Sequence, residues 1–151
     1  MKMEKQDIFR QVKIRIEESE SKLRSAVLEA EASRDSESKS SAGDKHETSR
    51  AMAQIEIENL QVQLQRVLEN KSILDKMRLD EDMIHGQLGA LIVTDSGTYF
   101  LSIGLGPVEI TGGSVVYAVS PQSPIGTMLM GKIKGDSVLL NGKKITLTEV
   151  V

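Results

Sequence analysis

The sequence has no cysteine and no tryptophan, and aromatic residues make up only 3% of its 151 positions. Without cysteine, disulfides, thiol catalysis and cysteine-ligated zinc sites are excluded, and the composition suits a reducing compartment. No window approaches the roughly 18 apolar residues of a membrane-spanning helix, and the charged N-terminal segment lacks the apolar core of a secretory signal. We therefore expect a cytoplasmic protein that neither crosses a membrane nor presents an aromatic surface for stacking bases.

Proline and glycine are nearly missing from the first half of the chain. Residues 1–82 contain no proline and one glycine, together with 15 Lys or Arg and 18 Asp or Glu. Residues 83–151 hold the other 11 glycines, all 3 prolines, and only 4 basic and 4 acidic residues. Glycine and proline interrupt regular elements, whereas dense mixed charge suits solvated helices. The composition therefore predicts a helical domain over residues 1–82 and a compact domain over residues 83–151.

Two runs in the first half repeat apolar or small residues at alternating spacings of three and four. This spacing is the heptad seam of a coiled coil. The only glycine of this half lies between the runs, so two helices of about 34 residues should form an antiparallel hairpin with its tip near residues 38–47. The seam becomes small toward the tip, which predicts weak hydrophobic packing there. The runs are Phe9, Val12, Ile16, Ser19, Leu23, Ala26, Ala30 and Ser33, then Ala53, Ile57, Leu60, Leu64, Val67, Lys71 and Leu74.

The same heptads would also suit a dimerising coiled coil, since such repeats commonly serve assembly. Against this, the chain doubles back at Gly43, which gives each seam a partner within the same molecule. Four apolar residues of the second helix lie off its seam, and we expect them to pack on the C-terminal domain or on a second chain. They are Ile55, Val62, Leu68 and Ile73.

The hairpin tip carries two carboxylates, Asp44 and Glu47, which are three residues apart and therefore on one helix face. Such a pair can share a Mg²⁺ ion, although a second molecule would have to supply the remaining ligands. Alternatively, Asp44 as the N-cap and Glu47 as the third helical residue would form a capping box and only stabilise the helix start. His46 is a further candidate for a ligand or an acid–base group, but a single exposed histidine is more often neither.

The second half alternates glycine with short apolar runs. Residues 88–94 and 98–103 flank Asp95-Ser96-Gly97, and residues 138–140 and 143–150 flank Asn141-Gly142, so each pair is predicted to form a β-hairpin. Residues 114–119 predict a fifth strand. Residues 124–130 predict a short helix with Ser123 as its N-cap, Pro124 at its first position and Gly131 after its end. Five strands around one helix predict an α+β domain, and no nucleophile with a nearby base marks a catalytic site.

Two motifs together resemble those of the Gre family of bacterial transcript-cleavage factors. Gly43-Asp44-x-x-Glu47, at the hairpin tip, resembles the family's G-D-[LF]-x-E-N. The second motif resembles the family's S-P-[LI]-G-x-x-L-x-G-K-x-x-G-D stretch, and it is more specific because nine positions match at fixed spacing. The order of the motifs and the expected architecture also match, so the resemblance covers nearly the whole chain. The second motif comprises Ser123-Pro124-Ile125-Gly126, Leu129, Gly131-Lys132 and Gly135-Asp136.

The resemblance implies a C-terminal domain with a fold like that of FK506-binding proteins (FKBP-like), which docks at the rim of the secondary channel of RNA polymerase. The hairpin would enter the channel, where Asp44 and Glu47 would help to hold a second Mg²⁺ while the polymerase's own active site cleaves backtracked RNA. The protein would then be an accessory factor rather than an enzyme, a monomer that binds no metal by itself, with RNA polymerase and nascent RNA as its partners. The implied docking residues are Ser123, Pro124, Ile125, Gly126, Gly131 and Lys132.

The tip departs from the family pattern. Lys45 stands where the family has an apolar residue, and Thr48-Ser49-Arg50-Ala51 replaces its Asn-Ala-Glu-Tyr, so a third acid and an aromatic ring are missing. Because some relatives occupy the same channel and inhibit or tune the polymerase, stimulation and inhibition of cleavage both stay open. Basic residues of the first helix either contact RNA or form a solvated face. They are Arg10, Lys13, Arg15, Lys22 and Arg24.

Two other classes of function also fit parts of the sequence. A structural coiled-coil adaptor would use the hairpin for assembly, with the tip carboxylates acting only as caps. A prolyl isomerase or chaperone would use the FKBP-like fold, although isomerases of that fold line their pocket with aromatic residues. Only Tyr99, Phe100 and Tyr117 are available for that purpose, and a fold does not by itself imply a function.

Overall fold

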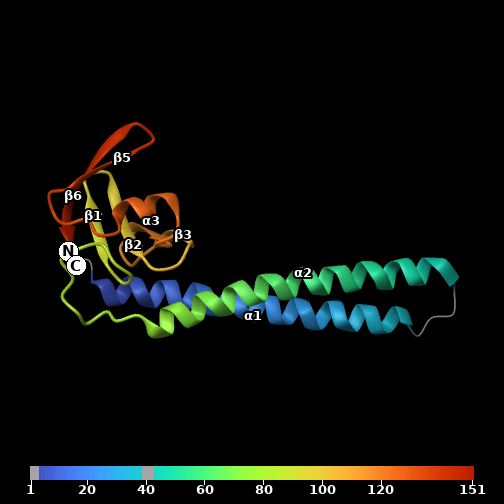
Figure 1. The fold of residues 1–151 in the computed structure, drawn as a ribbon. Coiled ribbons are helices and arrows are strands. Elements are labelled where there is room, and N and C mark those ends of the chain that lie inside the picture. Colours follow the sequence, from blue (N-terminus) through green and yellow to red (C-terminus); the bar gives the residue numbers. More distant parts are fainter. Residues whose placement is uncertain (1–3, 39–42) are drawn as a thin grey trace. The chain divides into compact units, whose positions relative to one another are not determined.

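A computed structural model describes residues 4–38 and 43–151 (Figure 1). Side chains at positions 37, 38, 43, 44 and 46 lie outside this description. The chain divides into two compact units, Arg15–Lys71 and a second unit that joins Met1–Ile14 to Ser72–Val151. Over the part of the chain that is described, no helix is both long and apolar enough to cross a lipid bilayer.

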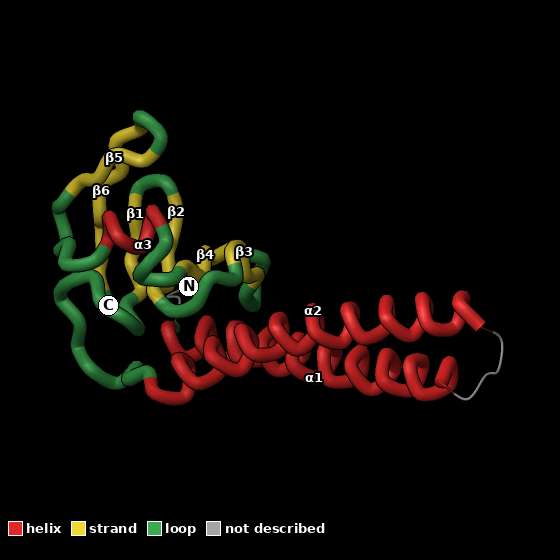
Figure 2. Tube along the Cα trace, turned by 45° about the vertical axis from the view of Figure 1, so that its right-hand side comes forward, coloured by secondary structure: helices red, strands yellow, loops and turns green. Residues whose placement is uncertain are grey.

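Two helices, α1 (Lys5–Ser38) and α2 (Gly43–Lys76), each have 34 residues and lie side by side as an antiparallel pair (Figures 1 and 2). The absence of proline and of internal glycine allows both to run without interruption. Five of the predicted seam residues are buried, among them Ile16 at 1% and Ile57 at 2% exposed, and nine others are partly buried. The predicted fold class, a helical hairpin followed by a β-rich α+β domain, is confirmed.

The seam prediction is wrong at Ser33, which is exposed, whereas the side chain of the next residue, Arg34, is only 28% exposed. A straight helix drifts by about 20° per heptad relative to a strict seven-residue repeat. Over the heptads that separate Phe9 from this point, the drift brings Arg34 toward the partner helix in place of Ser33. Arg34 Nη1 donates a hydrogen bond to Gln54 Oε1 at 2.8 Å, so a polar contact replaces apolar packing between the helices.

A second polar contact joins the helices farther from the turn. Lys71, a predicted seam residue, donates from Nζ to Glu20 Oε1 at 2.8 Å, and Arg24 Nε donates to Glu20 Oε2 at 2.9 Å. The Lys71 hydrogen bond and then the Arg24 hydrogen bond lower the pKa of Glu20.

Among the residues off the seam, Ile55 and Val62 are 57% and 53% exposed within this chain.

Six strands form one mixed sheet in the order β3-β4-β2-β1-β6-β5. Strands β2 and β4 pair in parallel, and every other neighbouring pair is antiparallel. One short helix, α3 (Pro124–Leu129), connects β4 to β5. The strands are β1 (Leu91–Thr94), β2 (Gly97–Leu101), β3 (Gly106–Glu109), β4 (Val115–Val119), β5 (Ser137–Leu140) and β6 (Lys143–Val150).

The predicted count of five strands is wrong, because the sequence analysis missed β3. This strand contains Pro107 directly after Gly106, two residues that normally argue against a strand interior. β3 lies at the edge of the sheet, where proline can be accommodated because no neighbouring strand requires its missing N–H. The two predicted hairpins, β1–β2 and β5–β6, are confirmed.

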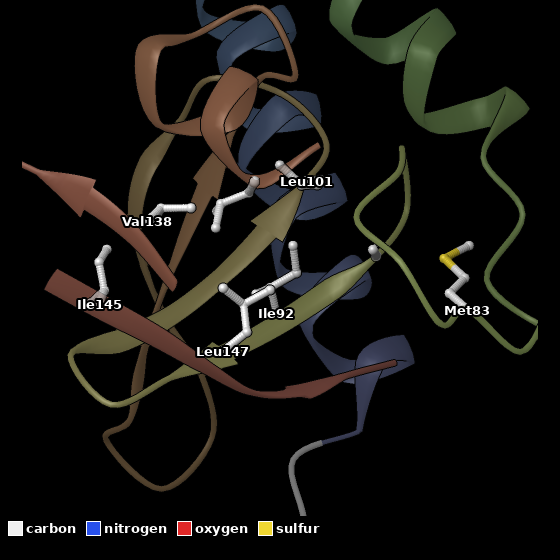
Figure 3. Close-up of a cluster of buried hydrophobic side chains, with 8 residues drawn as sticks. Met83, Ile92, Leu101, Val138, Ile145 and Leu147 are labelled. Atoms are coloured by element: carbon white, nitrogen blue, oxygen red, sulfur yellow. The ribbon is translucent and has the colours of Figure 1, made fainter. Parts of the chain in front are cut away.

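One buried cluster of the sheet domain, which we define as residues 83–151, packs against α3, whereas Leu91, Phe100 and Val116 are buried outside this cluster. The buried side chains of the cluster come from β1, β2, β5, β6 and α3, and Met83 adds to them from the segment after α2 (Figure 3). Lys5 at the start of α1 is bound to the same unit, since its Nζ donates to the Val151 carbonyl at 3.0 Å and lies 3.6 Å from Met83 Sδ. Burial lowers the pKa of Lys5, and the Asp82 charge opposes this in part.

Candidate functional site at the hairpin turn

Both predicted acidic residues belong to the first turns of α2. The helix begins at Gly43, so Asp44 is its second residue rather than the N-cap that a capping box requires. Asp44 and Glu47 are still three residues apart on one helix and share a face. The side chains of Asp44 and His46 lie outside the described ones, whereas Glu47 is exposed. Near a helix N-terminus, both carboxylates also favour the positive end of the helix dipole.

Glu47 lines an open groove of about 480 Å³ on one side of the hairpin. The groove combines residues of both helices: Arg34 and Asp35 of α1, and Glu47, Arg50, Ala51 and Gln54 of α2. Arg34 is held by Asp35 Oδ1 at 3.2 Å and by Gln54, whereas Arg50 is exposed and has no ion pair with another described residue. A carboxylate that shares a groove with an unpaired guanidinium group attracts divalent cations less strongly than an isolated acidic pair does.

The residues with described side chains include no group of three or more His, Asp or Glu that could hold a metal ion together. Carboxylate oxygens are suitable Mg²⁺ ligands, and exposed Glu47 is accessible to an ion held mainly by another molecule. Asp44 and Glu47 could therefore contribute ligands to a shared site, as the sequence predicts, and that role stays a prediction.

The five basic residues predicted to contact RNA fall on two flanks of α1. At about 100° per residue, Arg15 and Lys22 lie on one side of the seam, while the other three lie on the opposite side. Those three have acidic partners: Arg10 with Asp7 at 3.0 Å, Lys13 with Asp75 at 3.9 Å, and Arg24 with Glu20 at 2.9 Å. The basic residues therefore do not form one continuous positive stripe, and much of their charge is balanced nearby.

The second motif builds the start of α3. Ser123 is the N-cap, and its Oγ accepts a hydrogen bond from Gly126 N at 3.0 Å, while Pro124 occupies the first helical turn. A Cβ on Gly126 would collide with the carbonyl of Ser120, so the close approach of the chain requires glycine. The Ile125 side chain packs against the core. These residues therefore have roles in the fold whether or not they contact a partner.

The end of the same motif forms the exit from α3. Gly131 has φ of 78°, a left-handed conformation that glycine adopts without strain, and Asp136 Oδ2 accepts a hydrogen bond from Ile133 N at 2.9 Å. Among the six predicted docking residues, Pro124 and Gly131 are exposed and Gly126 is buried. The other three, Ser123, Ile125 and Lys132, are partly exposed. Docking through these residues stays a prediction.

The aromatic residues weigh against an isomerase pocket. Phe100 is fully buried in the sheet, so it cannot line a pocket for substrate. Tyr99 and Tyr117 form a tilted pair with ring centroids 5.7 Å apart. Burial, and then the nearby Tyr117 hydroxyl, raise the pKa of Tyr99. Only Tyr99 and Tyr117, from neighbouring strands, are therefore left to line such a pocket, which would need several aromatic rings.

Sequence reasoning missed Arg34 and Gln54 as residues of the groove. The signal was weak, because Arg34 lies one position beyond a predicted seam residue and Gln54 one position beyond Ala53. Only the pairing of the two helices brings them together, through the 2.8 Å hydrogen bond. Arg50 was noticed as a departure from the Gre pattern, and the structure places it in the groove with Glu47.

No protein-family model matches the chain, and no curated protein matches it either. One solved structure with detectable similarity is described as that of the transcription factor Gfh1. The match covers 91% of this chain and 92% of that chain, with 15% sequence identity and a TM-score of 0.36. This likeness leaves the family and the function of the chain open.

Proposed function

We propose that this protein is a transcription elongation factor that binds RNA polymerase, enters its secondary channel with the hairpin turn, and acts on Mg²⁺-dependent cleavage of backtracked RNA. The observation that carries the proposal is the pair of Gre-like motifs in one chain. One lies at the start of α2, directly after the hairpin turn, and the other forms α3. The protein would act in the cytoplasm as an accessory factor rather than as a complete enzyme.

The hairpin has dimensions that suit insertion. A helix of 34 residues extends about 50 Å at 1.5 Å per residue. Asp44 and Glu47 lie in the first turns of α2, at the N-terminal end of this helix. In the polymerase, these carboxylates would supply two oxygen ligands, and the bound Mg²⁺ would activate water for RNA hydrolysis. The contribution of this chain is to orient the two acids on one helix face.

A second function within the same channel is favoured by the groove beside Glu47. Arg50 adds a positive charge without an ion-pair partner among the described residues to the groove that Glu47 lines, and this charge opposes recruitment of a divalent cation, whereas Arg34 is paired with Asp35. With this tip, the protein would bind the polymerase and regulate it without stimulating cleavage. The two functions share the docking step and differ only in what the tip does.

A transcript-cleavage assay on stalled bacterial elongation complexes tests both. We expect the wild-type protein to bind the polymerase and to change the rate at which short 3′ RNA fragments are released. The Asp44→Ala/Glu47→Ala variant should lose that effect and still bind. The matched control is Glu17→Ala/Glu18→Ala, which removes two exposed carboxylates far from the turn in sequence.

The outcomes separate the hypotheses. Faster release of fragments supports stimulation, and slower release supports inhibition in the channel. If the wild-type protein does not bind polymerase in a pull-down, the proposal is wrong, and a dimer in light scattering would favour a coiled-coil adaptor. If the control variant loses the effect as fully as the tip variant, the acidic pair has no special role.

A further inference from the structure

Strand β5 is an edge strand, and within residues 4–38 and 43–151 it pairs only with β6. The turn at residues 141–142 has two positive φ angles, 50° and 79°, which define a two-residue type I′ hairpin. In such a hairpin the flanking pair, here Leu140 and Lys143, exchanges both backbone hydrogen bonds, and hydrogen-bonded pairs alternate from there. The N–H and C=O groups of Leu139 and Ser137 therefore point away from β6. Within the part of the chain that the structure describes, no backbone hydrogen bond outside the β5–β6 pair uses them.

An open groove of about 510 Å³ runs beside this edge, between β5 and the end of α3. Met128 and Met130 line it from α3 and the residue that follows, and Val138 and Leu139 line it from β5. Met130 is 40% exposed and Leu139 66% exposed, so apolar surface remains uncovered. Methionine side chains adapt to different apolar shapes. A free strand edge beside a helix is the geometry in which an extended peptide adds as a further strand.

Charge indicates what such a peptide must carry. All four basic residues of positions 83–151 fall within residues 132–144, on both sides of β5, and the same segment has one acid, Asp136. None of the four lysines forms an ion pair within the part of the chain that the structure describes. The segment therefore carries a net positive charge. The lysines are Lys132, Lys134, Lys143 and Lys144.

We propose that the β5 edge and its groove bind an extended segment of a partner protein in which acidic and apolar side chains alternate. The segment would pair with the outward backbone groups of Ser137 and Leu139. Successive side chains of a strand point to opposite faces, so one set enters the groove beside Met130. The other set lies on the face of Leu139, together with its cross-strand partner Lys144, which explains the need for acids there. This site is separate from the hairpin turn, but it shares Lys132 with the predicted docking residues.

Fluorescence anisotropy with the full-length protein tests the proposal. The probe is a short labelled peptide of alternating glutamate and valine, blocked at both ends, and its partner probe has lysine in place of glutamate. We expect binding of the first peptide only. Lys144→Glu should weaken this binding by about fivefold or more, because it replaces attraction by repulsion. The charge-matched control is Lys76→Glu at the end of α2, which should leave binding unchanged.

A backbone variant tests the mode of binding. Leu139→Pro removes an N–H that points outward, and it leaves the β5–β6 hydrogen bonds in place, so peptide binding should be lost from a folded protein. Leu139→Glu is the second variant, in case proline disturbs the strand, and it should reject the acidic peptide by charge alone. The proposal is overturned if neither variant affects binding, or if Lys76→Glu weakens it as much as Lys144→Glu. Preference for single-stranded RNA over the peptide would instead make this edge a nucleic-acid site.

Discussion

The Gly126→Ala substitution would show whether close packing alone is the reason why this position of the second motif is glycine. In an open helix, the change from glycine to alanine stabilises by about 0.5–1 kcal/mol. Here the added methyl group would collide with the Ser120 carbonyl and approach the Ser123 hydroxyl. That carbonyl is restrained, because it accepts hydrogen bonds from Ser123 N at 3.0 Å and from Ser123 Oγ. We expect the strain to prevail, with a net loss of about 1–3 kcal/mol in the free energy of unfolding.

Urea unfolding followed by tyrosine fluorescence measures this loss, since both tyrosines lie in the sheet domain. Each 1 kcal/mol should lower Tm by about 4–8 °C in a domain of this size. Gly104→Ala is the matched control, because a Cβ there meets nothing within 4 Å, and its effect should stay within about 0.5 kcal/mol. If Gly126→Ala is as stable as the unmodified protein, crowding is not the reason for glycine, and a partner contact becomes the better explanation.

Three further predictions concern polar contacts. The hydrogen bonds that lower the pKa of Glu20 stabilise the hairpin at pH values above the ordinary glutamate pKa. This contribution should disappear as the pH falls through the pKa that Glu20 has in the folded protein. Lys71→Met should reduce the difference between the Tm values measured at about pH 6 and about pH 3. An unchanged difference would show that the Lys71–Glu20 hydrogen bond does not cause this pH dependence. Arg34→Met removes the bond to Gln54, so we expect a loss of about 0.5–1.5 kcal/mol and faster amide exchange near the turn; exchange as slow as before would show that the contact is dispensable. Because burial lowers the pKa of Lys5, the unfolded chain binds more protons at alkaline pH, and stability should rise with pH toward 10.5. Lys5→Met should flatten that rise in urea unfolding, and a persistent slope would assign it to another group.

The sequence was most informative where a period repeats many times. Alternating spacings of three and four predicted both helices and the turn between them, because a buried seam must recur along the whole hairpin. The same period failed at Ser33, where accumulated drift brings Arg34 inward. Strand β3 was missed for the opposite reason. It has only four residues, one of them Pro107, and it depends on its pairing with β4 rather than on its own pattern.

The candidate sites show what sequence order cannot provide. Asp44 and Glu47 could be found from spacing within one helix, but the groove around Glu47 depends on which residues of α1 lie opposite. The lysines near the C-terminus are visible in the sequence, yet their significance depends on strand order, which places β5 at an edge. Contacts between distant segments are therefore the part that the pattern alone could not predict.

The segment between α2 and β1 is fastened to the sheet domain at Gly86. Its N–H donates to the Lys132 carbonyl and its carbonyl accepts from Gly131 N, both at 2.8 Å, and a side chain there would collide with the Leu129 carbonyl. A pull transmitted along α2 would therefore reach the exit of α3 before it reached β1. Load along this segment would first be borne by these two hydrogen bonds, and the first strand of the sheet would be shielded until they break.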